Sequence, residues 1–254
     1  MSIHHAARTG NISTLLTLLE NKADVDAKDN LDATPLHCTA YDGRVDAAKM
    51  LIDAKATIDA KNCTGSTPLH LAAGNGHRDF EKMLIDANAT VNALDENGKT
   101  PLHFAALNGD CDAVKVLIDA KATIDAKNTT GVTPLHVAIE LNNFDATEVL
   151  LEAKAYVEVK NNSGSTPLHL AALYGYNAFL RMLVNAKATV DAIDERNRTP
   201  LHFAAFGGHG DASQLLVGAK ASLEARDKDG KTPLDYATES GNNDIADMLI
   251  AAQE

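Results

Sequence analysis

The side chains of this chain best suited to metal binding or acid–base catalysis are ten histidines and three cysteines. Zinc sites in proteins carry these residues at short spacings, such as Cys-x-x-Cys or His-x-x-x-His. Neither spacing occurs here. Seven histidines instead recur every 33 residues: His4, His37, His70, His103, His136, His169 and His202. Because a fixed period explains their presence, we expect a structural role for them and no metal site.

No other pattern of reactive residues stands apart from this period. We find no glycine-rich phosphate loop, no Ser-His-Asp arrangement and no isolated pair of carboxylates. The sequence therefore predicts that the chain is not an enzyme, that it has no catalytic residues and that it needs no cofactor.

Six of the periodic histidines directly follow the tripeptide Thr-Pro-Leu. This tripeptide begins at residues 34, 67, 100, 133, 166, 199 and 232, without one insertion or deletion between them. A period of 20 to 50 residues is typical of a solenoid, in which each repeat buries its apolar face against its neighbours.

The repeat that begins at Thr67 shows the elements that this period predicts. Thr67 can cap a helix and Pro68 fits its first turn, so a short helix is expected to start there and to end at Gly76. A second helix is predicted from Arg78 to Ala87. Residues 90–98 then form an extended segment that closes in an Asn-Gly turn.

This order of elements and the motif Thr-Pro-Leu-His-x-Ala resemble the ankyrin repeat, over the whole chain. The resemblance implies an all-α solenoid of helix-turn-helix units with protruding β-hairpin-like loops. It also implies that the motif histidines His37, His70, His103, His136, His169 and His202 bond to backbone and hold adjacent loops together. We expect one repeat domain over residues 1–254, with a capping unit at 1–33, six internal units at 34–231 and a capping unit at 232–254.

Composition narrows the possible partners and the compartment. The net charge of −12 and a pI near 5.2 argue against nucleic acid or an anionic membrane surface as the main partner. Cys38, Cys63 and Cys111 show no pairing pattern, which favours reduced thiols and a cytoplasmic location. No apolar run approaches the ~18 residues that a membrane-spanning helix needs.

Two rows of charged residues recur with the period. Lysine follows the second helix at residues 22, 55, 121, 154, 187 and 220, where ankyrin repeats usually carry glycine. Positive charge is favourable at a helix C-terminus, so we interpret this row as structural. The second row contains Asp26, Asp59, Asn92, Asp125, Glu158, Asp191 and Glu224, and we expect it to be solvated loop surface.

The resemblance places partner contacts at the hairpin tips and at the two residues that end the first helix of each repeat. At those two positions the apolar and aromatic residues gather toward the repeats that begin at residues 133, 166 and 199. We therefore predict a partner-binding surface that includes Tyr41, Leu107, Leu141, Leu173, Tyr174 and Phe206. The alternative is that some of these side chains pack under the loops as core.

The predicted function is protein–protein recognition by a scaffold, inhibitor or adaptor that works as a monomer and has a protein partner of unknown identity. A targeting or regulatory module for a separate enzyme or channel is an alternative. A second alternative is a microbial effector that binds host proteins in the host cytosol. Near-identical blocks permit this, since residues 51–62 recur unchanged at 117–128.

Overall fold

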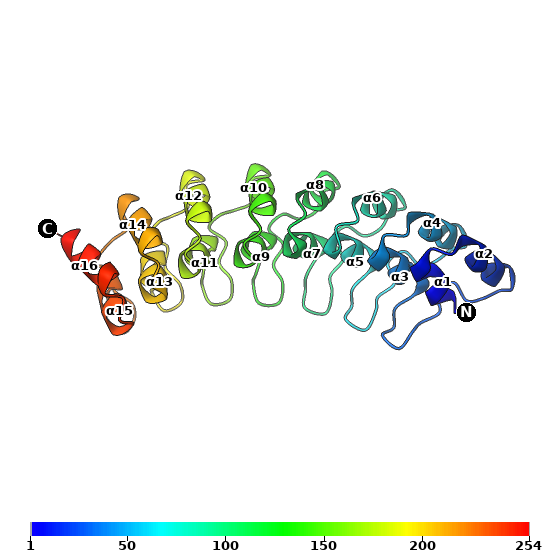
Figure 1. Ribbon diagram of the computed structural model, residues 1–254, viewed down its shortest axis with the longest axis horizontal. Coiled ribbons are helices and arrows are strands. Elements are labelled where there is room, and N and C mark those ends of the chain that lie inside the picture. The colour runs from blue at the N-terminus through cyan, green and yellow to red at the C-terminus, as the bar shows by residue number, and fades with distance from the viewer. Residues whose placement is uncertain (1, 254) are drawn as a thin grey trace. The chain divides into compact units, whose positions relative to one another are not determined.

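The computed structural model describes residues 2–253, and in this part of the chain it has sixteen α-helices and no strand. The helices form eight helix-turn-helix repeats (Figure 1), as the sequence predicted. The chain divides into two compact units, residues 1–129 with α1 to α8 and residues 130–254 with α9 to α16. We describe each unit by itself and call them the N-terminal and the C-terminal unit.

Each repeat contributes a first helix, which follows Ser2 in the first repeat and the motif threonine in the others, and a second helix after a tight turn. The first helices are α1 (Ile3–Thr9), α3 (Pro35–Asp42), α5 (Pro68–Gly74), α7 (Pro101–Asn108), α9 (Pro134–Glu140), α11 (Pro167–Leu173), α13 (Pro200–Gly207) and α15 (Pro233–Glu239). The second helices are α2 (Ile12–Glu20), α4 (Val45–Asp53), α6 (Arg78–Asp86), α8 (Cys111–Asp119), α10 (Phe144–Glu152), α12 (Asn177–Asn185), α14 (Gly210–Gly218) and α16 (Asn243–Ala251).

The motif threonine and proline start the first helix in the expected way. Thr67 is in the extended conformation, with φ −92° and ψ 166°, and Pro68 occupies the first turn of α5. Thr67 and His70 form a reciprocal capping box, in which each side chain bonds to the backbone of the other residue. The free amides at the start of the helix are thereby satisfied.

Left-handed residues end both helices of a repeat. Gly76 follows the first helix with φ 69°, and at the same place in the fifth repeat Asn142 adopts φ 60°. Lys121 follows the second helix with φ 68°, and its counterparts in the first seven repeats are also left-handed. Glycine adopts this conformation without strain, whereas a residue with a Cβ does so at a cost.

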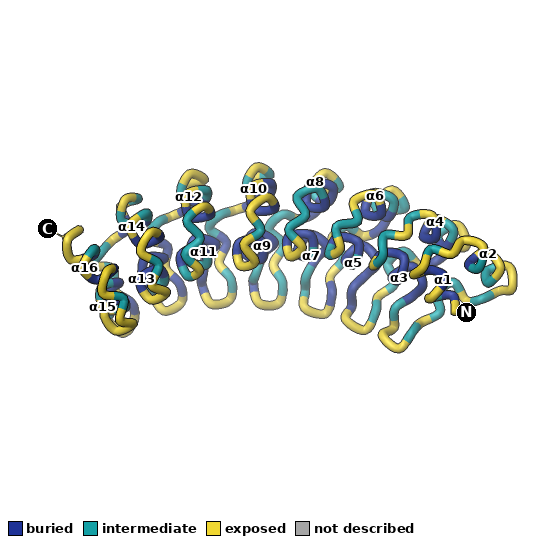
Figure 2. Tube along the Cα trace, viewed as in Figure 1, coloured by how far each residue is buried: buried dark blue, intermediate teal, exposed yellow. Residues whose placement is uncertain are grey.

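The core of each unit lies between stacked helices. In the N-terminal unit, α3 packs against α1 and α5, and α4 packs against α2 and α6. In the C-terminal unit, α11 packs against α9 and α13, and α14 packs against α12 and α16. The motif leucines are fully buried there except for Leu234, which is half-buried, and the alanine pairs of four repeats are fully buried, while the loop tips are exposed (Figure 2).

Backbone hydrogen bonds join each hairpin loop to the next one within a unit. In the N-terminal unit, the N–H groups of Cys63, Glu96 and Thr129 donate to the carbonyl oxygens of Leu31, Thr64 and Asn97, at 2.8, 3.0 and 2.9 Å. In the C-terminal unit, Asn162, Glu195 and Lys228 donate in the same way to Thr130, Ser163 and Arg196, at 3.0, 3.1 and 2.9 Å. The loops thus form a ladder of main-chain bonds without regular strands.

Candidate binding surface

The motif histidines lie in the core, and five of them connect their own helix start to the following loop. The Thr166 N–H donates to Nδ1 of His169 at 3.1 Å, and His169 Nε2 lies 3.0 Å from the carbonyl oxygen of Arg198. Because a backbone N–H can only donate, Nδ1 must be the acceptor, and Nε2 therefore carries the proton and donates to the carbonyl. The same Nε2 contact in other repeats reaches Ser66, Lys99, Ser165 and Lys231.

Burial keeps these imidazoles neutral. Desolvation lowers the pKa of His37, His70 and His202 below the usual value, and it lowers the pKa of His169 to about 4. Both ring nitrogens are engaged by backbone, so the rings have the environment of structural residues. No group of three or more His, Cys, Asp or Glu side chains that could hold a metal ion occurs among residues 2–253.

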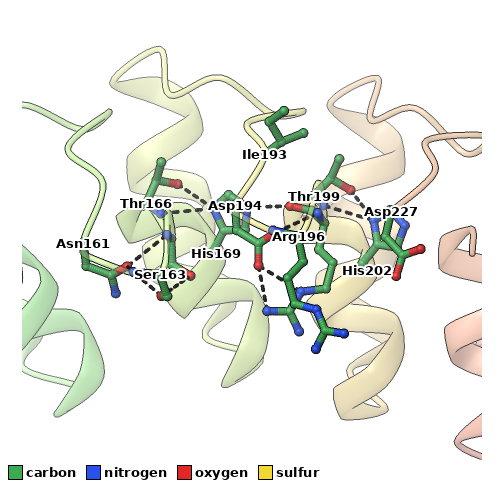
Figure 3. A network of polar contacts seen from close by, with 12 residues as sticks. Asn161, Ser163, Thr166, His169, Ile193, Asp194, Arg196, Thr199, His202 and Asp227 are labelled. Carbon is green, nitrogen blue, oxygen red and sulfur yellow. Dashed lines mark hydrogen bonds and ion pairs between the residues drawn. The ribbon is translucent and has the colours of Figure 1, made fainter. Parts of the chain in front are cut away.

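A polar network closes the hairpin loops beside these histidines (Figure 3). Asp194 Oδ1 accepts the backbone N–H groups of Arg196 and Arg198, both at 2.8 Å. Its other oxygen, Oδ2, accepts from Nε of Arg198 at 2.9 Å and pairs with Nη2 of the same guanidinium at 2.7 Å. Asn161 closes the preceding loop in the same way, because its Oδ1 accepts the N–H groups of Ser163 and Ser165 at 3.0 Å.

Members of the acidic row lie at the loop surface, and several of them also form hydrogen bonds to the next repeat. Asp59 Oδ1 accepts the backbone N–H of Thr90 at 3.0 Å, and its Oδ2 accepts the Thr90 hydroxyl at 2.6 Å. Asp26 makes the equivalent bonds to Thr57, and Asn92 accepts the N–H of Thr123 at 2.8 Å. These side chains therefore join consecutive repeats. The sequence of a single repeat does not show such hydrogen bonds, because their acceptor and donor lie in different repeats.

The six residues predicted to contact a partner lie at the ends of first helices. In the N-terminal unit, Tyr41 on α3 and Leu107 on α7 are exposed. In the C-terminal unit, Leu141 follows α9 and is exposed, and Leu173 ends α11 and is half-buried. Tyr174 is 38% exposed and Phe206 is 57% exposed. Most of these side chains are therefore accessible from solvent.

Aromatic side chains in the C-terminal unit extend this exposed set. Tyr174 stacks on Tyr176, with ring centroids 5.4 Å apart, and Tyr176 lies 5.6 Å from Phe179. Phe144 meets the other side of Phe179 edge-on at 5.8 Å and is itself exposed. The aromatic group thus runs from the buried Phe179 through Tyr176 to the exposed Tyr174. The two inner rings support the exposed ring of Tyr174.

A small hollow of about 150 Å³ lies beside this group, in the last three repeats. Its lining residues are Leu173, Arg198, His202, Phe203, Phe206 and Tyr236. The rings of Phe206 and Tyr236 meet edge-on at 6.4 Å, and the Arg198 guanidinium lies 4.5 Å from the centre of the Phe203 ring. The hollow is lined almost entirely by carbon. The polar atom of Tyr236, its hydroxyl, donates to Asp227 at 2.8 Å.

Sequence reasoning placed two of these lining residues, Leu173 and Phe206, in the partner-binding surface and named His202 as a structural motif residue, but it missed Arg198, Phe203 and Tyr236. A signal was present in the residue after the motif histidine. Aromatic side chains occupy that position in three repeats, as Phe104, Phe203 and Tyr236, whereas the other motif repeats have smaller side chains there. Two of the three fall in consecutive repeats, next to Phe206.

One buried carboxylate was also missed. Glu81 on α6 is fully buried, and neither of its carboxyl oxygens has a hydrogen-bond partner. Desolvation, with a smaller contribution from the charge of Asp110, raises the pKa of Glu81 to about 7. The equivalent position holds alanine, valine, threonine, leucine or serine in the other motif repeats.

Comparison with known proteins gives one family. The family model described as "Ankyrin repeats (3 copies)" matches residues 3–95, 57–128, 82–161, 102–194 and 186–254. Together these overlapping matches extend from residue 3 to residue 254. No curated protein matches the chain. Among the described helices, none has the length and apolar character that crossing a membrane requires.

Proposed function

The chain belongs to the ankyrin repeat family, and on that premise we propose that it binds a protein partner through the C-terminal unit and performs no catalysis itself. Ankyrin repeats are generally protein–protein interaction modules. The proposed surface is the concave face formed by the ends of the first helices, together with the hairpin tips beside them. Its centre is the group Leu141, Leu173, Tyr174 and Phe206.

The exposed aromatic side chains carry this proposal. Tyr174 and Phe206 present ring surface to water, and each is supported by a further ring, Tyr176 and Tyr236 respectively. Rigid aromatic side chains are frequent among the residues that dominate binding energy at interfaces. An exposed ring that is already held in place loses little conformational entropy when a partner covers it.

The remaining parts of the proposal concern the partner and the setting. A net charge of −12 favours a protein over nucleic acid as the partner. Cys38, Cys63 and Cys111 are all unpaired, which is consistent with a reducing cytoplasm. We propose a monomer that serves as a scaffold, inhibitor or adaptor.

The test uses Tyr174→Ala and Phe206→Ala, with Ile250→Ala as the control. Ile250 is an exposed apolar residue on the second helix α16, outside the proposed surface. A partner is first captured from lysate with the wild-type chain and identified by mass spectrometry. Each variant is then measured for affinity to that partner and, separately, for thermal stability.

We expect each of the two aromatic variants to lose about 2 kcal/mol of binding free energy or more, while the control keeps its affinity. If both aromatic variants lose stability and bind as tightly as the wild type, the rings belong to the core. The binding surface then lies elsewhere on the chain.

A further inference from the structure

We propose that the hollow lined by Leu173, Phe206 and Tyr236 receives one apolar side chain of a partner segment that carries a carboxylate beside it. This inference rests on the proposed protein-binding function and names the chemistry of the partner. We call the hollow, with the six lining residues given above, the anchor pocket.

The walls of the anchor pocket select an apolar group. Apart from the Arg198 guanidinium, the polar side-chain atoms of its lining residues already have partners inside the protein. The Tyr236 hydroxyl donates to Asp227 at 2.8 Å, and the His202 ring contacts the Thr199 N–H at 3.0 Å and the Lys231 carbonyl at 3.1 Å. A polar side chain would lose its bonds to water on entering and find no replacement there.

The size of the pocket limits the occupant to one side chain. Its volume is about 150 Å³, and apolar cavities of ~150 Å³ hold a benzene-sized group. Leucine, methionine and phenylalanine side chains are of this size. The rings of Phe203, Phe206 and Tyr236 would surround such a group, and burying it would stabilise the complex.

Arg198 supplies the charge that points to a carboxylate. Its Nε and Nη2 both bond to the same oxygen of Asp194, and a quarter of the Arg198 side chain is exposed. Within residues 2–253, its Nη1 forms no hydrogen bond or ion pair. A guanidinium with free donors at the edge of an apolar pocket is complementary to a carboxylate.

The cation is also held in place before binding. Asp194 fixes one edge of the Arg198 guanidinium, and the Phe203 ring lies 4.5 Å beneath it. The Asp194 side chain is fully buried and accepts two further backbone N–H groups of the same loop. The arginine therefore gives up little side-chain freedom when it binds a partner carboxylate.

The probe is a displayed library of 12-residue peptides, randomised at every position and selected on the immobilised full chain. We expect the enriched peptides to share a leucine, methionine or phenylalanine with an aspartate or glutamate nearby. One enriched peptide is then synthesised, and its affinity is measured for the wild type and for each variant. Thermal unfolding of every variant shows whether it is folded.

Three variants separate the parts of the inference. Leu173→Trp should fill the pocket and weaken peptide binding by more than about tenfold. Phe206→Ala removes an exposed wall and should have a similar effect, so it keeps the test decisive if Leu173→Trp does not fold. Arg198→Gln should lose about tenfold in affinity for the acidic peptide and little for the same peptide with the acid changed to its amide. Ile250→Ala is the control and should bind like the wild type.

Several results would overturn the anchor pocket. These are a selection that enriches no peptide, enriched peptides without an apolar residue, and binding that Leu173→Trp and Phe206→Ala leave unchanged. If Tyr174→Ala alone weakens the peptide, the protein-binding surface stands and the pocket is not its anchor. The captured partner of the previous test decides separately whether the surface itself binds protein.

Discussion

The lysine that follows the second helix in six of the repeats takes a backbone conformation that suits glycine better. Lys121 has φ 68°, and Lys55, Lys154, Lys187 and Lys220 have similar values. A Cβ in the left-handed region costs ~1–2 kcal/mol, whereas a positive charge at a helix C-terminus contributes only ~0.3–1 kcal/mol. Lysine is therefore not the most stable residue available at this position.

We predict that Lys121→Gly increases the free energy of unfolding. The relief of the left-handed strain, ~1–2 kcal/mol, is reduced by two losses, which are ~0.3–1 kcal/mol for the helix-end charge and ~0.4–1 kcal/mol for the added freedom of the unfolded chain. A net gain of up to about 1 kcal/mol is expected, measured by urea denaturation. The control is Lys115→Gly on the exposed side of α8, which should lose about 1 kcal/mol because its backbone is helical.

Destabilisation by Lys121→Gly would show that lysine is the preferred residue and that its side chain has a stabilising role.

Asn88 occupies the equivalent position in the third repeat with φ 67°. Since asparagine tolerates this conformation better than other residues with a Cβ, Lys121→Asn should fall between the wild type and the glycine variant.

Glu81 is a second position where one residue works against stability. Its carboxyl group is fully buried without a hydrogen bond, and its pKa is raised from the ordinary 4.5 to about 7. The carboxyl group of Glu81 ionises above pH 4.5 in the unfolded chain, where water surrounds it. In the folded protein it ionises only above about pH 7, and the resulting charge is buried. A shift of this size corresponds to about 3 kcal/mol of lost stability at high pH.

We predict that Glu81→Met stabilises the protein, and that the gain depends on pH. A raised pKa makes the folded state bind the proton more tightly, so the cost of Glu81 is greatest above pH 7 and disappears below pH 4.5. The advantage of methionine should therefore be about 2–3 kcal/mol at pH 8 and shrink as the pH falls through this window.

Urea denaturation at pH 8, 6 and 4.5 measures this difference. Glu148→Met on the exposed face of α10 is the matched control and should stay within about 0.5 kcal/mol of the wild type at each pH. An equal gain from Glu81→Met at pH 8 and pH 4.5 would mean that ionisation of Glu81 is not the cause.

At the scale of the elements, the hairpin loops depend on close backbone approach. Gly164 has φ 78°, and a Cβ there would lie 2.5 Å from the backbone nitrogen of Glu195, which bonds to Ser163 in the loop ladder. Gly230 has φ 80° at the same place in the last loop, and a Cβ there would meet no atom within 4 Å. The two glycines share a conformation and differ in what lies against them.

We predict that Gly164→Ala destabilises the chain much more than Gly230→Ala does. Gly230→Ala should cost about 1–2 kcal/mol, because only the left-handed conformation opposes it. Gly164→Ala adds a clash that must separate two loops and weaken their hydrogen bond, so a loss of about 3 kcal/mol or more is expected. Thermal denaturation of the two variants gives the comparison, and equal losses would contradict a loop ladder that needs this contact.

In the repeat that begins at Thr232, the residue that caps the first helix differs from the motif histidine. Asp235 replaces the motif histidine at the start of α15, and its Oδ2 accepts the N–H and the hydroxyl of Thr232 at 2.7 and 2.8 Å. These hydrogen bonds lower the pKa of Asp235 below its usual value. Aspartate therefore keeps the capping role of histidine, but as a carboxylate it has no N–H to donate as the motif histidines do.

At the scale of the whole molecule, each repeat is stabilised through its neighbours, and an end repeat has only one. We predict that backbone amides of the first and last repeats exchange with deuterium faster than those in the middle of each compact unit, because the free energy of local opening is lowest where fewest contacts must break. Hydrogen exchange followed by mass spectrometry resolves this by segment. Uniform protection over residues 2–253 would indicate a single cooperative transition and contradict the prediction.

The period of the sequence determined the helices, their caps and the loops, since these depend on residues close together in the chain. Thr-Pro, the turn glycines and the apolar spacing each act within one repeat, so the helix starts at Pro68 and Arg78 could be predicted. The same reasoning located the apolar positions that end the first helices, including Tyr174 and Phe206. It could not measure their exposure, because exposure depends on what the next repeat covers.

Only the tertiary structure decided how residues of different repeats meet. The anchor pocket joins Leu173, Phe206 and Tyr236, which lie about one repeat apart from each other along the chain. Likewise, nothing in the helix α6 itself shows that Glu81 is buried. The packing of α6 against α4 and α8 removes the Glu81 side chain from water. The distance between side chains of different repeats depends on how the helices stack and on the volume of the side chains between them. The 33-residue spacing of the sequence specifies neither of these.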